Sequence, residues 1–233
     1  MVTRALILAG GAGPRRIELD AAWPGWDAQL DLIIGADAGA LLAAPLGVAL
    51  DLIVGDGDSL GAAALAAFEA GGVAVERAPA DKDASDLELA LAAAVRRGAT
   101  ELVVVGAFGG RIDHFLANVW LLAWPGLPGG GLTLLDERTR VRLLTAPGPD
   151  RSAVRIGLAG RPTDVVTLLP FAGPAKGVTT HGLRWPLAGA TLLMGSSLGL
   201  SNEVLAPAGQ QPWVQLARGR LLVIETTLLG SQS

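Results

Sequence analysis

Apolar and polar positions follow two different patterns along the 233-residue chain. Up to about residue 145, short continuous apolar runs alternate with alanine- and leucine-rich stretches of helical length. Continuous apolar runs are typical of parallel strands that helices cover on both faces. The pattern predicts helices at 38–44, 61–70, 86–97 and 113–123, and strands at 4–9, 31–35, 51–55, 72–76, 101–106 and 131–135. We therefore expect an α/β N-terminal domain with a mainly parallel sheet flanked by helices.

Beyond this region the chain has short strand-like segments separated by glycine and proline, without a helical period. The predicted strands are 152–158, 164–169, 176–180, 190–194, 213–216 and 220–226. This number of short strands is enough for a C-terminal all-β sandwich domain. We expect the two domains to comprise residues 1–147 and 148–233.

Composition excludes several functional classes. The formal charge of −4 gives no electrostatic footprint for nucleic acid or an anionic membrane. The absence of cysteine excludes disulfides, thiolate zinc sites and thiol nucleophiles, and it fits a cytoplasmic protein. Prolines, glycines and polar residues interrupt the uncharged stretches, and no export signal is recognisable, so we expect a soluble, unprocessed protein. Small-molecule chemistry is the remaining expectation.

Acidic residues follow the predicted strands repeatedly. Asp37 ends one apolar run, Asp56 and Asp58 follow the next, and Asp83 and Asp86 precede a predicted helix. Because helix-covered parallel sheets bind ligands outside the carboxyl ends of their strands, these side chains should converge on one crevice. A divalent cation relieves the repulsion between crowded carboxylates, and Mg²⁺ combines a few carboxylates with phosphate oxygens and water.

Several of these acids also have a structural interpretation. Aspartate is a favoured helix N-cap, so Asp37, Asp58 and Asp113 remain open between capping and ligand binding. Ser85 followed by Glu88 has the spacing of a capping box, which assigns Glu88 to structure. A cap needs only one carboxylate, so the closely spaced acids in GDGDS favour a metal site.

The segment GAFGGRIDH, residues 106–114, adds positive charge to this acidic edge. Its glycines permit close backbone approach to a ligand, and a following helix N-terminus and Arg111 suit phosphate. A surface ion pair between Arg111 and Asp113 is the alternative. The N-terminal LAGGAGPRR is a weaker signal, because Arg16 stands where a dinucleotide-binding loop has its third glycine.

Taken in order, four segments resemble the motif series of the thiamine pyrophosphokinase family: GADAGA (35–40), DLIVGDGDSL (51–60), DKDASDLELAL (81–91) and GAFGGRIDHFLANVWLL (106–122). HGLRWPL (181–187) and GLSNEV (199–204) are similar to that family's thiamine-domain motifs. The resemblance implies a nucleotide-binding catalytic domain followed by a thiamine-binding domain. It also implies transfer of pyrophosphate from ATP to the hydroxyl of thiamine with Mg²⁺, in a homodimer whose site lies at the subunit interface.

The resemblance also implies residue roles. Metal ligands would be Asp56, Asp58 and Asp86. The catalytic set would be Asp37, Asp86, Arg111 and Asp113. Independently of the resemblance, the transfer needs an acceptor for the hydroxyl proton, and the sequence leaves this open between Asp86 and Asp113. Cofactor and substrate binding would involve Ser59, Arg111, Asp113, Trp185, Ser201 and Asn202. Trp185 is equally compatible with a place in the β-domain core. Ser85 stands where the family usually has threonine, which keeps the hydroxyl.

Three alternatives remain. GDGDS after a strand also resembles the motif of haloacid-dehalogenase-type phosphatases, in which Asp56 would be the nucleophile and Asp58 the acid/base. The N-terminal glycine-rich loop is similar to that of sugar-nucleotide transferases. A thiamine- or nucleotide-binding module without turnover is the non-enzymatic alternative. The phosphatase alternative leaves the GGRIDH motif without a role. The sugar-nucleotide transferase alternative leaves the acids of GDGDS without one.

Overall fold

The chain folds into two compact units, Met1–Glu137 and Arg138–Ser233. The computed structural model describes residues 4–77, 83–129, 131–146, 153–207 and 209–228. The expected domain boundary, between residues 147 and 148, lies outside the described residues. The units divide earlier because strand β7 (Thr139–Ala146) pairs along its whole length with β14 (Gly219–Thr226), and so belongs to the second unit.

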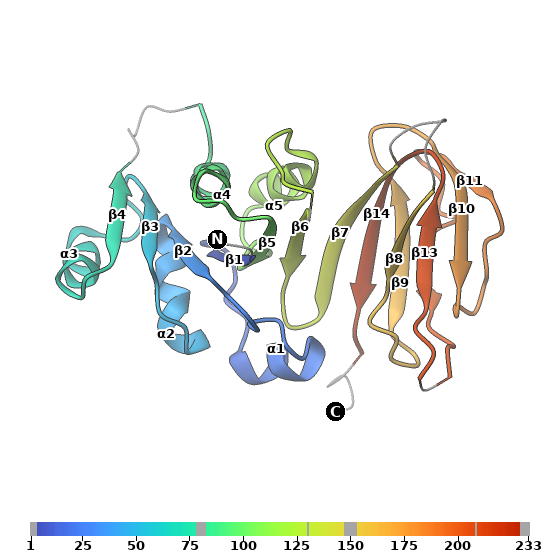
Figure 1. The fold of residues 1–233 in the computed structure, drawn as a ribbon, viewed down its shortest axis with the longest axis horizontal. Coiled ribbons are helices and arrows are strands. Elements are labelled where there is room, and N and C mark those ends of the chain that lie inside the picture. Colours follow the sequence, from blue (N-terminus) through green and yellow to red (C-terminus); the bar gives the residue numbers. More distant parts are fainter. Residues whose placement is uncertain (1–3, 78–82, 130, 147–152, 208, 229–233) are drawn as a thin grey trace. The chain divides into compact units, whose positions relative to one another are not determined.

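The N-terminal unit contains a parallel sheet in the order β6-β5-β1-β2-β3-β4 (Figure 1). Every recorded pairing within this part of the sheet is parallel. The strands match the predicted runs closely; they are β1 (Arg4–Leu8), β2 (Leu32–Ala36), β3 (Leu52–Gly55), β4 (Ala74–Arg77), β5 (Glu101–Val105) and β6 (Leu132–Leu135).

Helices cover both faces of this sheet, as expected for continuous apolar strands. They are α1 (Arg16–Ala22), α2 (Ala43–Leu46), α3 (Ala62–Ala70), α4 (Asp86–Arg96) and α5 (Ile112–Trp120), with 3-10 helices η1 (Asp37–Leu42) and η2 (Leu121–Ala123). Side chains of α1 and α2 pack with Leu6 and Leu8 of β1 on one face. Helix α4 contacts β1, β2 and β3, on the opposite face from α1 and α2 (Figure 1).

The strand order places a crevice beside β1. The chain runs outward from β1 through β2 and β3 to β4, and then returns to the other side of β1 with β5. The connection after β1 therefore leads to one side of the sheet, and the connection after β5 leads to the other side. Ligands of open α/β sheets bind at such a switch point, outside the carboxyl ends of the strands.

The C-terminal unit contains two antiparallel arrangements of strands. One has the order β12-β9-β14-β7 and the other β11-β10-β13-β8. Besides β7 and β14, the strands are β8 (Val154–Gly157), β9 (Val165–Pro170), β10 (Ala175–His181), β11 (Ala190–Leu192), β12 (Asn202–Glu203) and β13 (Trp213–Leu216). The unit is thus the expected all-β sandwich.

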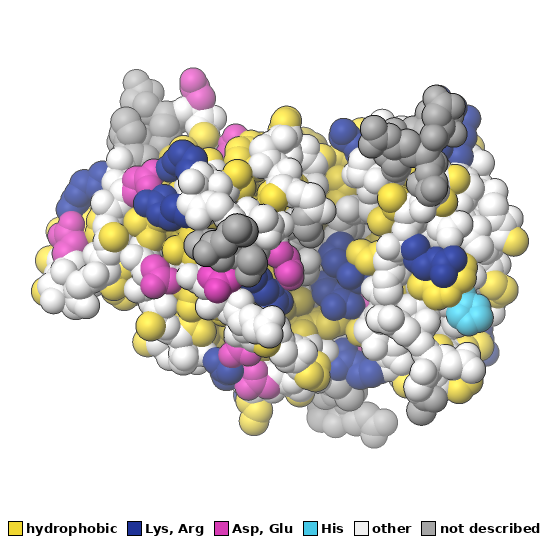
Figure 2. All heavy atoms as spheres, viewed as in Figure 1, with side chains coloured by type: hydrophobic (Ala, Val, Ile, Leu, Met, Phe, Trp, Pro, Cys, Tyr) yellow, Lys and Arg dark blue, Asp and Glu magenta, His cyan; other side chains and the backbone are white. Residues whose placement is uncertain are grey.

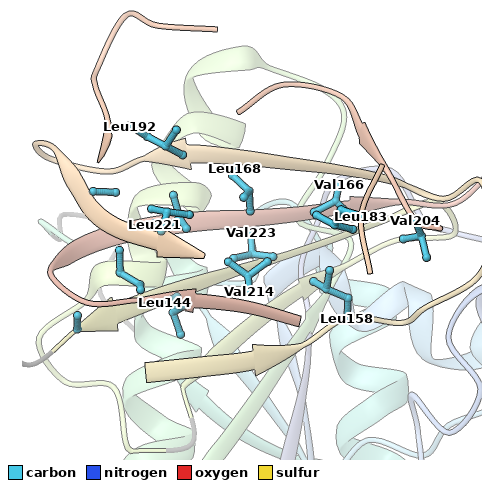
Figure 3. Close-up of a cluster of buried hydrophobic side chains, with 14 of the residues drawn as sticks. Leu144, Leu158, Val166, Leu168, Leu183, Leu192, Val204, Val214, Leu221 and Val223 are labelled. Carbon is cyan, nitrogen blue, oxygen red and sulfur yellow. The ribbon is translucent and has the colours of Figure 1, made fainter. Parts of the chain in front are cut away.

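Aliphatic side chains from both sheets fill the core of this sandwich (Figure 3). Val223 of β14 and Val214 of β13 come from different sheets and belong to the same buried cluster. Apolar burial of about 25 cal/mol per Å² makes such a cluster the main stabilising contribution of a sandwich.

The predicted set lacked α1, β7 and β12, which are present. The helix predicted at 38–44 is instead the 3-10 helix η1 followed by the short α2. The strand predicted at 152–158 is observed as β8, and its residue 152 lies outside the described residues. None of the helices in the described ranges is long and apolar enough to cross a membrane.

Candidate active site

A cavity of about 430 Å³ lies at the carboxyl edge of the N-terminal sheet. Residues that directly follow three of its strands line the cavity: Ala9 after β1, Asp37 after β2 and Gly106 after β5. Its position is therefore the switch point that the strand order creates. The remaining lining comes from the loops after β1, β3 and β5 and from α4 and α5, and includes Ser59, Ser85, Asp86, Gly110, Arg111, His114 and Asn118.

Glycines allow the loops around the cavity to pack backbone against backbone. A Cβ atom on Gly11 would lie 2.4 Å from the carbonyl oxygens of Gly106 and Phe108, and one on Gly39 would lie 2.0 Å from that of Leu8. No side chain fits at such separations. The N-terminal glycine loop is thus required for packing, and its residues Gly10 and Gly11 also line the cavity.

Three carboxylates converge beside the cavity. Each of Asp37, Asp56 and Asp58 offers one oxygen, and these oxygens lie within 4.8 Å of one another. Asp37 is buried, Asp56 is half-buried and Asp58 is exposed, so the group opens from the sheet edge toward solvent. Asp37 has a buried Oδ1 without a hydrogen-bond partner among the described residues. A cation that prefers oxygen ligands would satisfy this atom and relieve the repulsion.

Asp37 also has an unusual backbone conformation, with a φ of 44°. Aspartate tolerates the left-handed region better than most residues, because its short side chain can hydrogen-bond locally. Burial raises the pKa of Asp37, and the neighbouring charges of Asp86 and Asp56 raise it further, against hydrogen bonds from Ser59 that lower it. A raised pKa and an unsatisfied oxygen are features of functional carboxylates.

Asp86 lies close to this group although it belongs to α4. A Cβ atom on Gly55 would be 3.0 Å from Cβ of Asp37 and 3.3 Å from Oδ1 of Asp86. A side chain at position 55 would therefore push the two acids apart. The end of β3 has to be glycine for Asp37 and Asp86 to approach it together.

Two helix N-termini supply positive potential to the cavity. Ser85 caps α4 by accepting a hydrogen bond from the backbone N–H of Glu88 at 3.2 Å. Arg111 occupies the N-cap position of α5, and its side chain makes no cap hydrogen bond. Within the first turn, Oδ1 of Asp113 accepts from the backbone N–H of His114 at 3.0 Å. Unpaired N–H groups and the helix dipole favour anions such as phosphate. Asn118 holds the preceding loop by donating to the carbonyl of Ala107 at 2.9 Å.

Arg111 and Asp113 form a two-point ion pair at the mouth of the cavity. Nη2 of Arg111 lies 2.6 Å from Oδ2 of Asp113, and Nε lies 3.1 Å from Oδ1. The hydrogen bond from Arg111 lowers the pKa of Asp113 to about 2. The surface ion pair considered as an alternative is therefore present, and Arg111 lines the cavity as well.

The predicted residues of the C-terminal unit form a second, separate group. The side chain of Asn202 is buried; its Oδ1 accepts from the backbone N–H of Trp185 at 3.0 Å, and its Nδ2 donates to the carbonyl of Trp185 at 2.6 Å. Trp185 itself is 53% exposed, so it is no part of the sandwich core. Ser201 has a φ of 54° and is held by its N–H bond to Oγ1 of Thr167. Asn202 thus fixes the exposed tryptophan.

The structure therefore brings together most of the sequence-predicted residues of the N-terminal unit. Asp83, which was expected at the same crevice, is exposed and does not line the cavity, and Asp113 reaches its mouth only through the ion pair with Arg111. The cavity lining includes Asp37, Ser59, Asp86 and Arg111, and the carboxylate group adds Asp56 and Asp58. Acidic side chains on the face shown in Figure 2 are concentrated over this unit. The analysis of the sequence missed Asn118, whose amide pairs with a carbonyl brought close only by the fold.

Two family models match the chain, one in each unit. The model described as thiamin pyrophosphokinase, catalytic domain, matches residues 26–127. The model described as thiamin pyrophosphokinase, vitamin B1 binding domain, matches residues 154–220. The cavity and carboxylate group lie almost entirely within the first match, and Trp185, Ser201 and Asn202 lie within the second.

Named relatives and solved structures agree with these matches. The chain is 28% identical over 221 residues to thiamine pyrophosphokinase from Bacillus subtilis (strain 168), covering 95% of this chain and 97% of the relative. It is 27% identical to thiamine pyrophosphokinase 2 from Arabidopsis thaliana, covering 66% of this chain and 58% of that protein. The crystal structure of the B. subtilis protein superimposes with a TM-score of 0.76 at 25% identity, covering 97% of this chain and 100% of that one. A structure from Geobacillus thermodenitrificans, at 24% identity and a TM-score of 0.77, shares the fold over 98% of this chain and 99% of that one.

Proposed function

Because the chain belongs to the thiamine pyrophosphokinase family, we propose that it transfers the pyrophosphoryl group of ATP to the hydroxyl of thiamine, giving thiamine diphosphate and AMP. The hydroxyl oxygen of thiamine forms a bond to the β-phosphorus, and the bond from this phosphorus to the oxygen shared with the α-phosphorus breaks. The observation that carries the proposal is the convergence of carboxylates and helix N-termini on one cavity at the switch point of the sheet.

The carboxylate group fits a divalent cation. Asp37, Asp56 and Asp58 would hold Mg²⁺, since one oxygen from each lies within 4.8 Å of the others and Oδ1 of Asp37 is buried without a partner in the described ranges. The ligand set predicted from the motifs had Asp86 in place of Asp37. We propose that Asp86 borders the same ion from α4. When bound, Mg²⁺ would neutralise charge on the phosphates of ATP.

Phosphate binding is assigned to backbone and guanidinium groups. The first turns of α4 and α5 line the cavity with the positive ends of their helix dipoles, and Arg111 stands at the start of α5. Phosphoryl transfer requires mainly positioning and charge stabilisation, which such preorganised donors supply. Ser59 lines the cavity beside the acids, where its hydroxyl and N–H can bind nucleotide or orient Asp37.

Asp86 is the better candidate for the acceptor of the hydroxyl proton. Asp113 has a pKa of about 2 because of its hydrogen bond from Arg111, and a group with so low a pKa is a weak base at neutral pH. We therefore assign Asp113 to holding Arg111 in place. Asp86 lines the cavity at the start of α4, close to the carboxylate group.

Trp185, Ser201 and Asn202 are proposed to contribute to thiamine binding. Thiamine is an aromatic cation, and the exposed ring of Trp185 suits it by stacking and cation–π attraction. Asn202 acts through Trp185, because its amide is occupied by that residue's backbone.

We also propose a cytoplasmic homodimer whose copies together complete the active site. In this single chain, helix α5 buries none of its side chains, and Ile112 and Leu116, four residues apart on one face, are 70% and 46% exposed. A second copy would remove this apolar surface from water. The lack of cysteine agrees with a reducing compartment. Sedimentation velocity tests the dimer: Leu116→Glu is expected to shift it toward monomer.

The function is tested by incubating the purified protein with ATP, Mg²⁺ and thiamine and separating the products by chromatography. Thiamine diphosphate and AMP in equal amounts, dependent on Mg²⁺, are the expected products. ADP with thiamine monophosphate would instead show a simple kinase. Inorganic phosphate would favour the phosphatase interpretation, and thiamine binding without ATP consumption would favour the binding module.

A further inference from the structure

Leu42, the last residue of η1, lies between two of the loops that line the cavity but is not itself part of the lining. Helix η1 begins at Asp37, the buried member of the carboxylate group, and is six residues long, which is about two turns of a 3-10 helix. A displacement of one end of so short an element also displaces the other. The contacts of Leu42 therefore bear on the position of Asp37.

The middle of η1 is fixed to the ends of two strands by close contacts. Ala40 is fully buried, and a Cβ atom on Gly35 of β2 would lie 2.7 Å from its Cβ. Gly39 approaches the carbonyl oxygen of Leu8, at the end of β1, in the same way. Because neither glycine leaves space for a side chain, η1 packs on this edge of the sheet in only one way. The place of Leu42 at its end follows from this packing.

The two methyl groups of Leu42 contact two different loops. A Cβ atom on Gly13, in the loop after β1, would lie 2.4 Å from Cδ2, and one on Gly106, at the start of the loop after β5, would lie 2.7 Å from Cδ1. Each methyl group therefore packs directly against the backbone of a glycine. Leu42 is half-buried and also packs on the apolar cluster that contains Leu6 and Leu8 of β1. One side chain thus fills the space between η1 and both loops.

The two loops are bonded to each other and carry groups of the cavity wall. The backbone N–H of Gly11 donates to the carbonyl of Gly106 at 2.8 Å, and a second backbone bond of 2.8 Å joins the loops farther along. Gly11 and Gly106 line the cavity, and the loop after β5 ends at Arg111. The loops therefore form one hydrogen-bonded layer, and Leu42 sets how far this layer lies from the helix that begins at Asp37.

We propose that Leu42 is a positioning residue for phosphate binding, which fixes the separation between the carboxylate group and the loops after β1 and β5. The inference rests on the proposed function, which assigns the phosphates of ATP to this cavity. The carboxylates and the loop donors act on the same phosphates, so their separation has to match the ligand. A misplacement of about 1 Å can cost about 10²-fold in rate. Leu42 acts through Asp37 and the glycine loops, without contact to the nucleotide.

Steady-state kinetics and calorimetric titration of the whole protein with ATP and Mg²⁺ test the proposal. Leu42→Ala leaves a void between η1 and the loops, so KM and Kd for ATP should rise by about 5- to 10-fold, while KM for thiamine stays within about twofold. Leu42→Met keeps the volume of the side chain and should stay within about twofold of the wild type. The matched control is Leu41→Ala, which truncates a neighbouring leucine that is 51% exposed and should leave all three constants unchanged.

Substitution of the opposing glycine gives a second test, which does not depend on the stability of Leu42→Ala. Gly13→Ala places a methyl group 2.4 Å from Cδ2 of Leu42, which forces that side chain to turn away and should raise KM for ATP by about 2- to 5-fold. In the double variant Leu42→Ala/Gly13→Ala, the added methyl group occupies part of the void. Its KM for ATP should therefore be no higher than that of Leu42→Ala alone. Effects that multiply would overturn the proposal, because the two residues would then act separately.

The results also separate this inference from the proposed function. Weaker ATP binding by Leu42→Ala than by Leu41→Ala supports the inference even if the wild type forms no thiamine diphosphate. A lower melting temperature of Leu42→Ala with wild-type KM and Kd for ATP would show that the leucine only stabilises the fold, and would overturn the inference while leaving pyrophosphoryl transfer intact. An equal rise in KM for thiamine would also overturn it, since the effect would not be confined to the phosphate cavity. Absence of ATP binding by the wild type would refute both.

Discussion

Asp37 and Glu225, a buried acid from each unit, have opposite surroundings. Asp37 in the N-terminal unit is 4% exposed, and its Oδ1 has no hydrogen-bond partner within the described ranges. Glu225 in the C-terminal unit is 3% exposed, and its two oxygens accept from Arg140 at 2.8 Å each, from Arg142 at 2.7 Å and from the N–H of Ala159 at 2.6 Å. Burial raises the pKa of Asp37. Burial also acts to raise the pKa of Glu225, but the two arginines outweigh it and lower the pKa.

The difference distinguishes a scaffold charge from a functional one. Glu225 connects β14 to β7 and to the residues after β8, so its charge is compensated when the unit folds. Asp37 is held at a positive φ among other carboxylates, and the groups that act on its pKa include hydrogen bonds from Ser59 but no basic side chain. A buried carboxylate without compensation destabilises a protein, and such sites persist where a ligand supplies the missing partner.

Removing the charge of Glu225 should have the largest effect on stability. Glu225→Gln removes the buried charge to which the partly buried guanidiniums of Arg140 and Arg142 bond, which is expected to lower the free energy of unfolding by about 3–5 kcal/mol. Chemical denaturation followed by circular dichroism measures this loss. Glu203→Gln, on an exposed ion pair with Arg184, is the matched control and should cost less than about 1 kcal/mol. Equal losses in the two variants would contradict the scaffold role.

At the carboxylate group of Asp37, Asp56 and Asp58, we expect a large loss of activity with little loss of stability. Asp58→Asn removes an exposed ligand oxygen, so turnover should fall by about 10²- to 10³-fold while the unfolding free energy changes by less than about 0.5 kcal/mol. Product formation at saturating Mg²⁺, ATP and thiamine, together with thermal unfolding, measures both. The control is Asp83→Asn, an exposed acid outside the cavity lining. Activity like that of the wild type in Asp58→Asn would refute the metal assignment.

The sequence predicts elements well where apolar residues are continuous, and less well where charge is buried. The parallel strands of the N-terminal unit are visible because helices cover both of their faces. Strand β7 was missed because Arg140 and Arg142 interrupt its apolar pattern, and Glu225, distant in sequence, compensates them only in the folded unit. Helix α1 was missed because it is short and follows a glycine-rich loop.

The candidate site, too, could be predicted from the sequence only in part. Position after a strand is readable from the sequence, so Asp37, Asp56 and Asp58 could be expected near one another. The grouping of Asp37 with the acid pair depends on a backbone φ of 44° and on the close approach that Gly55 permits, neither of which a motif reveals. The role of Asn202 as a clamp on Trp185 likewise depends on two backbone groups that only the fold brings to its amide.

Glu225 should also determine how stability changes at low pH. Because the folded-state pKa of Glu225 is lowered, its contribution is fully present above the unfolded value near 4.5 and is lost as pH falls through the folded value. The wild type should therefore lose stability below about pH 4.5 more steeply than Glu225→Gln, which has no carboxyl to protonate. Unfolding free energies measured from pH 3 to pH 7 give the two slopes. Parallel curves would mean that Glu225 does not contribute to acid unfolding.

The smallest expected effect is a change of stability at Asp37, and its sign is the informative part. Asp37→Asn removes a buried charge that has an unsatisfied oxygen, while asparagine tolerates a φ of 44° as aspartate does. Without Mg²⁺, the variant should be as stable as the wild type or more stable by about 1 kcal/mol. Asp37→Ala removes the same charge but disfavours the left-handed backbone by about 1–2 kcal/mol, so it should be less stable than Asp37→Asn. Thermal unfolding in the presence of a chelator compares the three proteins. If Asp37→Asn were destabilised by several kcal/mol, Asp37 would be a scaffold charge like Glu225, and its unsatisfied oxygen would not mark a ligand site.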